Sequence, residues 1–511
     1  MISILLIFVI GFLFISDKML AFGKETYVKD PNGNYSIVPS VKNRIFKAPI
    51  SDVVAKSSLA NAPYFKLRKG YDIKIEGSPL KETTDYKATT YAINPKDFIG
   101  ISPIPKVVVE VGDEVKAGDV LFFDKKNPSI KYTAPVSGEI AAVNRGEKRS
   151  IADVVILADK EISYKTFETG DLAGLSREDV VSQMLAAGLW PYLKQRPFNE
   201  IASVDETPKG IFISAFDSHP MAVNLNYTLA GTDADFQKGI DALNKLTDGA
   251  VNLSMDASES PASAFINAKN VNHYWFEGKH PAGNVGIQIH HIDPILKGDI
   301  VWTIAAEDVV TIGKYFNKGI YDPVRTVALG GPQVKKPGYY KTRQGANLSG
   351  LLDQNLESDH VRVIGGNVLT GKQVDPSNGH LGFFDNQVSI VEEGDQYEMF
   401  GWLIPSYMRP SISKSLPASL FPNYRFNVNT NTHGEHRAFV VTGQYESVLP
   451  MNVYPQHLLK AVIANDLDKM EGLGIYELVE EDLALCEFVC TSKQHVQEIL
   501  REGLDYVKEQ G

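Results

Sequence analysis

The sequence predicts an α+β protein of several domains, with a small β-sandwich, an α/β layer, a β-grasp unit and a helical C-terminal segment. Three observations support this. The 511 residues exceed what one hydrophobic core usually organises, so three or four domains are expected. Two Gly-Asp pairs, Gly112-Asp113 and Gly118-Asp119, introduce short β-branched runs. Between residues 170 and 320, strand-like and helix-like patterns alternate.

The composition excludes several classes of function. The formal net charge of −11 argues against nucleic-acid binding, because phosphate neutralisation requires a basic surface. Cys486 and Cys490 are the only two cysteines of the 511 residues, which excludes a disulfide framework. They also cannot hold, by themselves, an iron–sulfur cluster that needs four cysteines. Protein partners and small ligands remain open.

Residues 1–62 are interpreted as an N-terminal extension. Residues 1–16 are apolar and uncharged, but they are shorter than the roughly 20 residues that cross a bilayer. A signal peptide would carry Lys or Arg before its apolar run, and here only the terminal amine precedes it. Two interpretations stay open, a leader or anchor and a start site assigned too far upstream. We favour the second.

Residues 63–165 are predicted to form the β-sandwich. Each glycine of the Gly-Asp pairs supplies the positive-φ corner that a tight hairpin needs. The spacing resembles the barrel-sandwich hybrid of lipoyl and biotinyl carriers, which present one lysine on a hairpin tip. Lys125 or Lys126 would be that lysine, but no methionine flanks either of them. We therefore expect a solvated basic loop.

Three further segments narrow this resemblance to one family. With residues 65–70 (FKLRKG), 124–128 (DKKNP) and 143–146 (VNRG), the chain resembles the NqrA family of the Na+-translocating NADH:quinone reductase from about residue 63 to its end. Family members usually begin near residue 65, so residues 1–62 have no counterpart.

The resemblance implies a peripheral subunit on the cytoplasmic face of the bacterial inner membrane. The six-subunit complex oxidises NADH, reduces ubiquinone or menaquinone to the quinol and exports Na+. The five other subunits would be the partners, above all the membrane-embedded quinone and flavin subunit. Flavins and iron centres would belong to those partners, with no cofactor on this chain and no independent activity of the isolated chain.

Residues 166–320 are predicted to form a Rossmann-like α/β layer. We expect helices over residues 179–189 and 235–246, and buried strands over residues 210–216 and 250–255. No Gly-rich phosphate loop follows any of these strands, and residues 214–220 (SAFDSHP) lack glycine altogether. We therefore do not expect a nucleotide site. The family resemblance agrees, since it implies a layer similar to the flavin-binding subunit of respiratory NADH dehydrogenases without its flavin loop.

His290, His291 and Asp293 form the densest polar group of this domain. We interpret the segment as a strand, on which adjacent side chains point to opposite faces, so the two histidines are not expected to share a metal ion. Family members commonly have Gly-Thr-His-Ile-His here, which corresponds to residues 286–290. Gln288 replaces the first histidine, and His290 is kept.

The next two units complete the predicted core. Residues 321–375 read as a strand hairpin, a helix and a returning strand, which is a β-grasp outline similar to the soluble-ligand-binding SLBB module. Residues 376–450 are expected to add strands that return to the core. Phe400 and Trp402 are predicted core residues, although an aromatic slot also suits a flat quinone ring. With His290, they are the predicted quinone contacts.

Residues 451–511 are predicted to be helical, with Cys486 and Cys490 on one helix face. We interpret the two cysteines as buried side chains, and a metal site is expected only if another subunit supplies further ligands. Two other functions stay open. One is a lipoyl- or biotinyl-like carrier or scaffold with an SLBB ligand-binding module, and the other, based on the apolar leader, is an anchored or exported ligand-binding module.

Overall fold

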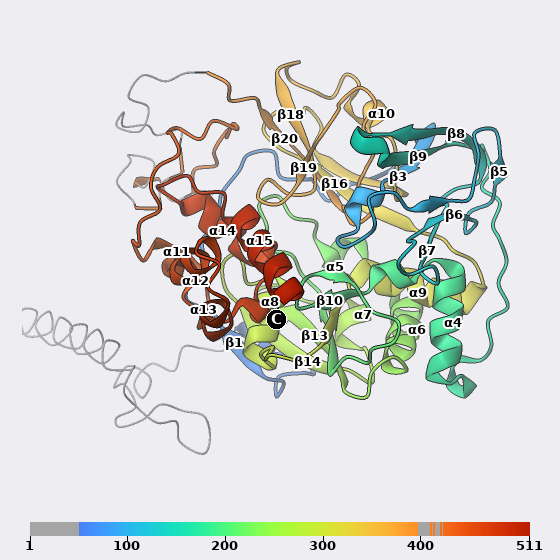
Figure 1. The fold of residues 1–511 in the computed structure, drawn as a ribbon, viewed down its shortest axis with the longest axis horizontal. Helices are drawn as coiled ribbons and strands as arrows, with labels where there is room; N and C mark the ends of the chain where they lie inside the picture. Colours follow the sequence, from blue (N-terminus) through green and yellow to red (C-terminus); the bar gives the residue numbers. More distant parts are fainter. Residues whose placement is uncertain (1–50, 397–408, 411, 414–419, 422, 511) are drawn as a thin grey trace, which may run out of the picture. The chain divides into compact units, whose positions relative to one another are not determined.

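The computed structural model describes residues 51–396, 409–410, 412–413, 420–421 and 423–510. The chain divides into two compact units, and the boundary follows Ala60. The described part of the first unit holds one short helix, α3 (Asp52–Ala55), whose N-cap Ser51 accepts a hydrogen bond from the Val53 N–H. All other elements that the structure describes belong to the second unit (Figure 1).

Two small antiparallel sheets form the predicted barrel-sandwich domain. One sheet has the strand order β3-β9-β8-β5, and the other has the order β4-β6-β7. Leu121, Phe122, Tyr132 and Ile140 are buried in this domain. The strands are β3 (Thr90–Ile93), β4 (Lys106–Val107), β5 (Glu114–Val115), β6 (Val120–Phe123), β7 (Lys131–Thr133), β8 (Gly138–Arg145) and β9 (Ile151–Ala158).

The Gly-Asp pairs form the corners that the sequence predicts. Gly112 has a φ of 96° and Gly118 a φ of 98°, in the left-handed region that glycine adopts without strain. Each following aspartate then closes its own turn. Asp113 accepts a hydrogen bond from the Glu110 N–H at 2.7 Å, and Asp119 accepts one from the Lys116 N–H at 2.8 Å. The same local chemistry is thus used twice.

A seven-stranded sheet forms the α/β layer, in the order β1-β14-β13-β12-β15-β10-β11. In this order, the five strands β1, β14, β13, β12 and β15 run parallel to one another. Strand β10 pairs antiparallel with β15, and β11 pairs antiparallel with β10. The strands are β1 (Tyr64–Lys66), β10 (Lys194–Arg196), β11 (Glu200–Ile201), β12 (Gly210–Ser214), β13 (Ala250–Asp256), β14 (Asn272–Glu277) and β15 (Val301–Thr303).

Helices α4 (Arg177–Ala187), α6 (Asp233–Asn244), α8 (Val285–Ile292) and α9 (Ala306–Lys318) belong to this layer, with the short helices α5 (Leu225–Thr228) and α7 (Ser263–Ile266). Two glycines bring α6 and α9 unusually close. A Cβ on Gly239 would lie 2.1 Å from the Val309 carbonyl oxygen, and a Cβ on Gly313 would lie 1.7 Å from that of Asp235. Neither position therefore accepts a side chain without separating the helices.

A six-stranded sheet, in the order β19-β18-β20-β16-β17-β2, contains the predicted β-grasp. The hairpin of β16 (Val324–Gly330) and β17 (Gly338–Arg343) leads to α10 (Ser349–Leu352), then to β18 (Val361–Gly365) and β19 (Lys372–Val374). The last strand, β20 (Gln387–Glu392), lies between β16 and β18. A buried cluster that includes Val327, Leu348 and Ile390 fills the space beneath the sheet.

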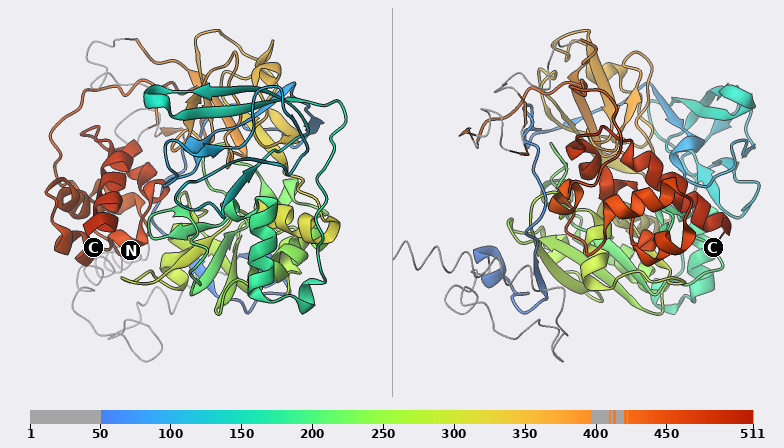
Figure 2. Two further views of the ribbon diagram at one scale, coloured as in Figure 1. Left: turned by 45° about the vertical axis from the view of Figure 1, so that its right-hand side comes forward. Right: turned by 60° about the vertical axis from the view of Figure 1, so that its left-hand side comes forward.

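Helices α11 (Gln444–Val448), α12 (Pro455–Ile463), α13 (Leu467–Gly472), α14 (Glu480–Val489) and α15 (Val496–Gln510) form the C-terminal helical segment. Figure 2 shows these helices, coloured red, packed together as one bundle. Their shared core includes Leu458, Leu483, Leu500 and Leu504. Across the described residues, no helix is both long and apolar enough to span a bilayer.

Several predicted divisions of the chain differ from the observed sheets. Strand β1 belongs to the α/β sheet and β2 (Thr83–Asp85) to the β-grasp sheet, although both precede the barrel-sandwich strands. The β-grasp sheet also continues past residue 375, because β20 lies inside it. Of the strands predicted within residues 376–450, β20 is formed, and between residues 423 and 443 the structure has only isolated bridges at Phe426 and Asn429.

Candidate functional site

The carboxyl end of β12 lies where the strand order of the α/β sheet reverses. From β12, the chain runs outward through β13 and β14, then returns to β15 on the other side of β12. Loops on the two sides of such a point diverge, and ligands of open α/β sheets bind in the resulting crevice. The loop after β12 (residues 215–220) and the loop after β14 (residues 278–284) both begin at the carboxyl edge of the sheet, because the two strands run parallel.

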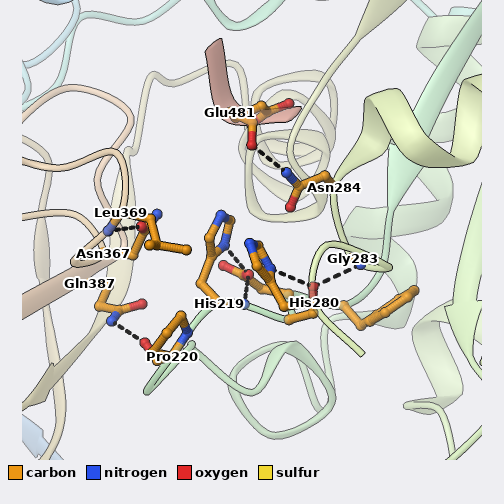
Figure 3. A network of polar contacts seen from close by, with 12 residues as sticks. His219, Pro220, His280, Gly283, Asn284, Asn367, Leu369, Gln387 and Glu481 are labelled. Carbon is orange, nitrogen blue, oxygen red and sulfur yellow. Dashed lines mark hydrogen bonds and ion pairs between the residues drawn. The ribbon is translucent and has the colours of Figure 1, made fainter. Parts of the chain in front are cut away.

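We call Asp217, Ser218, His219, His280 and Asn284 the switch-point cluster. Figure 3 labels His219, His280 and Asn284 of this cluster. Asp217 fixes His219 in two ways. Its Oδ1 accepts a hydrogen bond from the His219 backbone N–H at 2.8 Å, and the same oxygen contacts Nδ1 of the His219 ring. The ring of His219 therefore has its Nδ1–H directed at a carboxylate.

Ser218 fixes the second ring. Its Oγ lies 3.0 Å from Nδ1 of His280 and accepts a hydrogen bond from the Gly283 N–H at 2.9 Å. Gly283 has no room for a side chain, since a Cβ would lie 2.6 Å from the Ser218 backbone nitrogen. The His280 backbone N–H donates to Asp72 Oδ1 at 2.9 Å, which anchors the loop from the other side.

The two imidazoles lie against each other, with ring centroids 4.7 Å apart and planes at 44°. Burial opposes charge on His219, but Asp217 and Glu481 outweigh it, so the pKa of His219 is raised. Burial and the neighbouring His219 hold the pKa of His280 well below its ordinary value. Burial disfavours the carboxylate of Asp217, yet His219 more than compensates, and the pKa of Asp217 is lowered. The pKa values of two adjacent imidazoles are thus shifted in opposite directions.

The C-terminal helices cover the cluster through polar contacts. Asn284 Nδ2 donates to the Glu481 carbonyl oxygen at 2.9 Å. Arg196, at the end of β10, donates to Asp482 Oδ2 at 2.8 Å and to Glu481 Oε1 at 2.6 Å. From the β-grasp sheet, Gln387 Nε2 donates to the Pro220 carbonyl oxygen at 3.0 Å. The α/β layer, the C-terminal helices and the β-grasp sheet therefore meet around the switch-point cluster.

Gln288, which replaces the first histidine of the family pattern, lies on α8 beside this loop. Its Nε2 donates to Ser214 Oγ at 2.8 Å and more weakly to the Ala282 and Gly283 carbonyl oxygens, at 3.2 and 3.3 Å. The side chain is buried and ties the end of β12 to the start of α8. At this position the glutamine acts as a positioning residue for the two loops.

The expectation that His290 and His291 lie on a strand is wrong, because both lie on helix α8. The Asn452 N–H donates to His290 Nε2 at 3.0 Å, so Nδ1 carries the proton and donates to Glu477 Oε2 at 2.6 Å. His291 donates from Nε2 to the Pro450 carbonyl oxygen at 2.9 Å. Asp293 instead accepts from Lys209 at 3.1 Å. The three side chains do not converge on one point.

The other predicted site residues are dispersed. Phe400 and Trp402 lie outside the described residues. Cys486 lies on α14 and Cys490 caps its C-terminus, and both are buried. The Tyr445 hydroxyl donates to Cys490 Sγ at 2.9 Å. Across the described part of the chain, no three His, Cys, Asp or Glu side chains are grouped as metal ligands would be.

Lys125 and Lys126, the prosthetic-group candidates, are exposed in the loop between β6 and β7. The loop is shaped by Asp124, whose Oδ1 accepts a hydrogen bond from the Lys126 N–H at 3.1 Å. No described contact marks either ammonium group as special, and the loop is of the solvated basic kind.

Sequence reasoning missed His219, His280 and Asn284. In residues 214–220, the missing phosphate-binding glycine pattern argues against a nucleotide site and says nothing of other ligands. The useful signal is different, since three polar side chains closely follow a buried strand of a parallel layer. His280 and Asn284 follow another such strand, β14, at the same edge of the sheet.

Comparison with known proteins identifies the domains. The family described as "NqrA N-terminal barrel-sandwich hybrid domain" matches residues 65–159, "NqrA second alpha/beta domain" matches residues 175–321, and "NQRA C-terminal domain" matches residues 326–375. These matches confirm the predicted barrel-sandwich, α/β and SLBB-type domains. A solved NAD+-reducing [NiFe]-hydrogenase, in the air-oxidized state, is 11% identical over 68% of this chain and 67% of that chain, with a TM-score of 0.35, too low to support an argument.

Two curated relatives, both named as NqrA components of the Na(+)-translocating NADH-quinone reductase, match nearly the whole chain. The protein of Yersinia pseudotuberculosis serotype O:1b (strain IP 31758) is 39% identical over 449 residues, which is 87% of this chain and 100% of the relative. The protein of Vibrio vulnificus (strain YJ016) is 38% identical over 448 residues, 87% of this chain and 99% of the relative. Because three NqrA domain families match successive parts of the chain and these relatives match at 38–39% identity, the chain belongs to the NqrA family of the Na+-translocating NADH-quinone reductase.

Proposed function

We propose that this chain acts as the peripheral NqrA component of a Na+-translocating NADH-quinone reductase. In that complex, NADH oxidation would reduce ubiquinone or menaquinone to the quinol while Na+ leaves the cytoplasm. The observation that carries this proposal is the match to relatives named for that enzyme over essentially their full length, at 38–39% identity. The carrier alternative has no comparable support, since the loop with Lys125 and Lys126 is an ordinary exposed turn.

The proposed location is the cytoplasmic face of the bacterial inner membrane. The chain would bind there to the other five subunits, chiefly the membrane-embedded subunit that holds quinone and flavin. The segment before α11 has exposed apolar side chains, which supports the proposal that a protein partner covers it. Leu420, Phe421, Val440 and Val441 are all about half exposed or more. Apolar surface of this kind gains stability when a partner covers it.

The flavins and iron centres of the complex are proposed to belong to the partner subunits. Two observations support this division. The α/β layer lacks a Gly-rich loop after any of its strands, so no backbone cradle for a flavin phosphate is encoded. The two cysteines are too few for a cluster. A quinone contact on this chain is proposed for His290, Phe400 and Trp402.

The test is affinity purification of the full chain from its native membranes, in mild detergent and moderate salt, followed by mass spectrometry. We expect membrane-embedded flavoprotein subunits to purify with it in equal amounts. The same spectra give the mass of the peptide that carries Lys125 and Lys126, and we expect it unmodified. A chain that purifies alone, or that carries a prosthetic group on either lysine, would overturn the proposal in favour of a carrier.

A further inference from the structure

Three buried polar atoms of the switch-point cluster have no hydrogen-bond partner among the described residues. They are Nε2 of His219, Nε2 of His280 and Oδ1 of Asn284, and each is shielded from solvent. His280 is only 1% exposed and Asn284 only 3%. Leaving a buried polar group unsatisfied lowers stability, and proteins keep few such groups. Three such atoms in one cluster therefore require a physical explanation.

The two rings are held by their other nitrogens. Asp217 accepts from Nδ1–H of His219. Ser218 Oγ has one lone pair engaged by the Gly283 N–H and a second that can accept Nδ1–H of His280. When both rings are neutral and in this tautomer, each Nε2 atom carries a free lone pair. Figure 3 shows the two rings side by side, with the Asn284 oxygen directed toward them.

This arrangement is the one that metal-binding histidines use. A ligating imidazole almost always donates its other ring N–H to a carboxylate or another oxygen, which fixes its tautomer and orientation. Here Asp217 supplies a carboxylate for one ring, and Ser218 supplies a hydroxyl oxygen for the other. Two imidazole nitrogens with an amide oxygen suit borderline divalent ions such as Zn2+ or Co2+ better than Mg2+ or Ca2+.

The charges around the cluster favour a cation. Asp217 and Glu481 both act on His219, and Asp482 lies beside Glu481 on α14. Arg196 is the cation paired with Glu481 and Asp482. Glu481 and Asp482 thus face one guanidinium, and Asp217 adds a third carboxylate beside His219, so these carboxylates outnumber Arg196 near the two rings.

Space also distinguishes a metal ion from a larger ligand. A hydrogen-bonded oxygen lies about 2.7–3.2 Å from a nitrogen donor, whereas Zn2+ lies about 2.0–2.1 Å from an imidazole nitrogen. Neither Nε2 atom has the exposed surface that an accessible oxygen position would leave. An ion bound to both nitrogens would need less space than such an oxygen, because its bonds to nitrogen are shorter.

We propose that Nε2 of His219, Nε2 of His280 and Oδ1 of Asn284 bind one divalent transition-metal ion of the Zn2+ class. The ion would join the loops after β12 and β14 beneath the C-terminal helices, since Asn284 also holds the Glu481 carbonyl oxygen. This site goes beyond the proposed function, because it needs neither quinone nor another protein. Metal binding would stabilise the junction of these elements.

The experiment uses the full chain, without a polyhistidine tag, stripped of metal by a chelator and then titrated with Co2+ and with Zn2+. Visible absorption of the Co2+ form and calorimetry with Zn2+ should both give one equivalent per chain. His219→Gln and His280→Gln should abolish this binding. His360→Gln is the matched control, because His360 is an exposed histidine that also pairs with an aspartate, Asp395. The His360→Gln variant should bind one equivalent of metal, as wild type does.

A second variant tests the supporting contact while it keeps all three ligands. Asp217→Asn should weaken metal binding by about 10–100-fold, as for other carboxylates that orient a ligating histidine. This result decides the question if His219→Gln or His280→Gln fails to fold, as judged by circular dichroism of the metal-free chain. The absence of stoichiometric binding, or equal binding by wild type and Asp217→Asn, would overturn the site and show adventitious surface binding only.

Discussion

Arg196 and Asp482 form an ion pair without solvent exposure, 2.8 Å from Nη1 to Oδ2, between the α/β sheet and the C-terminal helices. Their side chains are 1% and 0% exposed. Because the pair is dry, removing one partner leaves an uncompensated buried charge, which is more costly than the loss of the attraction itself.

Asp482→Asn should therefore lower the free energy of unfolding by about 3 kcal/mol, toward the lower end of the usual range because Glu481 still pairs with Arg196. Urea unfolding followed by circular dichroism measures the change. Asp505→Asn is the control, since Asp505 forms a long 3.4 Å contact with Arg501 and is mostly exposed. Similar stability losses in the two variants would show that burial of the pair is not the cause.

Gly286 lies on α8 directly against this ion pair. A Cβ there would lie 2.2 Å from Arg196 Nη1 and 2.5 Å from both carboxylate oxygens of Asp482. Gly286→Ala should displace the pair and destabilise the chain by about 1–3 kcal/mol. Gly472→Ala, at the end of α13 with no atom within 4 Å of its Cβ position, should leave the urea midpoint unchanged or raise it slightly. If Gly286→Ala leaves the free energy of unfolding unchanged, the ion pair must relax freely around the added methyl group.

Glu307, in the first turn of α9, makes stability depend on pH. Burial raises its pKa to about 7 and outweighs Arg325 and Asn386, which favour the carboxylate. The folded state thus holds a proton that the unfolded chain releases near its ordinary pKa of 4.5. Between those two values, stability falls as pH rises, by about 3 kcal/mol over the whole range if this group acts alone.

Glu307→Gln should remove this dependence. Urea midpoints measured at half-unit steps from pH 5 to 8 should slope less steeply in the variant than in wild type, with the curves closest at the acid end. Parallel curves would mean that Glu307 is ionised throughout this range.

His290 is the predicted quinone contact that the structure describes. Since both of its ring nitrogens are engaged, His290→Ala also breaks the link from α8 to Glu477 and Asn452. If the ring contacts quinone, this variant should raise the quinone KM of the assembled enzyme several-fold. Glu477→Gln alters only the partner of the Nδ1 hydrogen bond and should leave KM unchanged. Equal kinetics in the two variants would limit His290 to holding the C-terminal helices.

Cys486 and Cys490 should resist alkylation in the folded chain. Burial raises the pKa of Cys486 well above its ordinary value, so the reactive thiolate is scarce. The Tyr445 hydroxyl covers Cys490 Sγ at 2.9 Å. Ellman's reagent at pH 8 should titrate no thiol before unfolding and two after it. Rapid reaction of either thiol in the native chain would contradict the described packing.

The sequence predicts local geometry here better than long-range assembly. The corners at Gly112 and Gly118 are encoded by adjacent residues, and the structure confirms them. Helix α8 resembles a strand in sequence because Val285, Ile287 and Ile289 alternate with other residues, a pattern that a buried helix can also show. Asn284 at its N-cap position is the better indicator.

The switch-point cluster lies beyond sequence reasoning for a topological reason. Ser218 and His280 are 62 positions apart and meet only because β12 and β14 end at the same edge of one sheet. Residue types could mark each loop as polar, but their meeting requires the order of the strands. That order depends on β1 and β15, whose three-residue lengths give almost no periodic signal.

The early position of β1 has a consequence for how the protein is made. Its Tyr64 hydroxyl donates to Glu277, 213 positions later, and among the described strands β1 pairs with β14 alone. At translation rates of about 5–20 residues per second, roughly 10–40 s separate the appearance of the two segments at the ribosome. During this interval the nascent strand has no sheet to join, so we expect the α/β layer to close from its N-terminal edge last, after the barrel-sandwich strands are already complete.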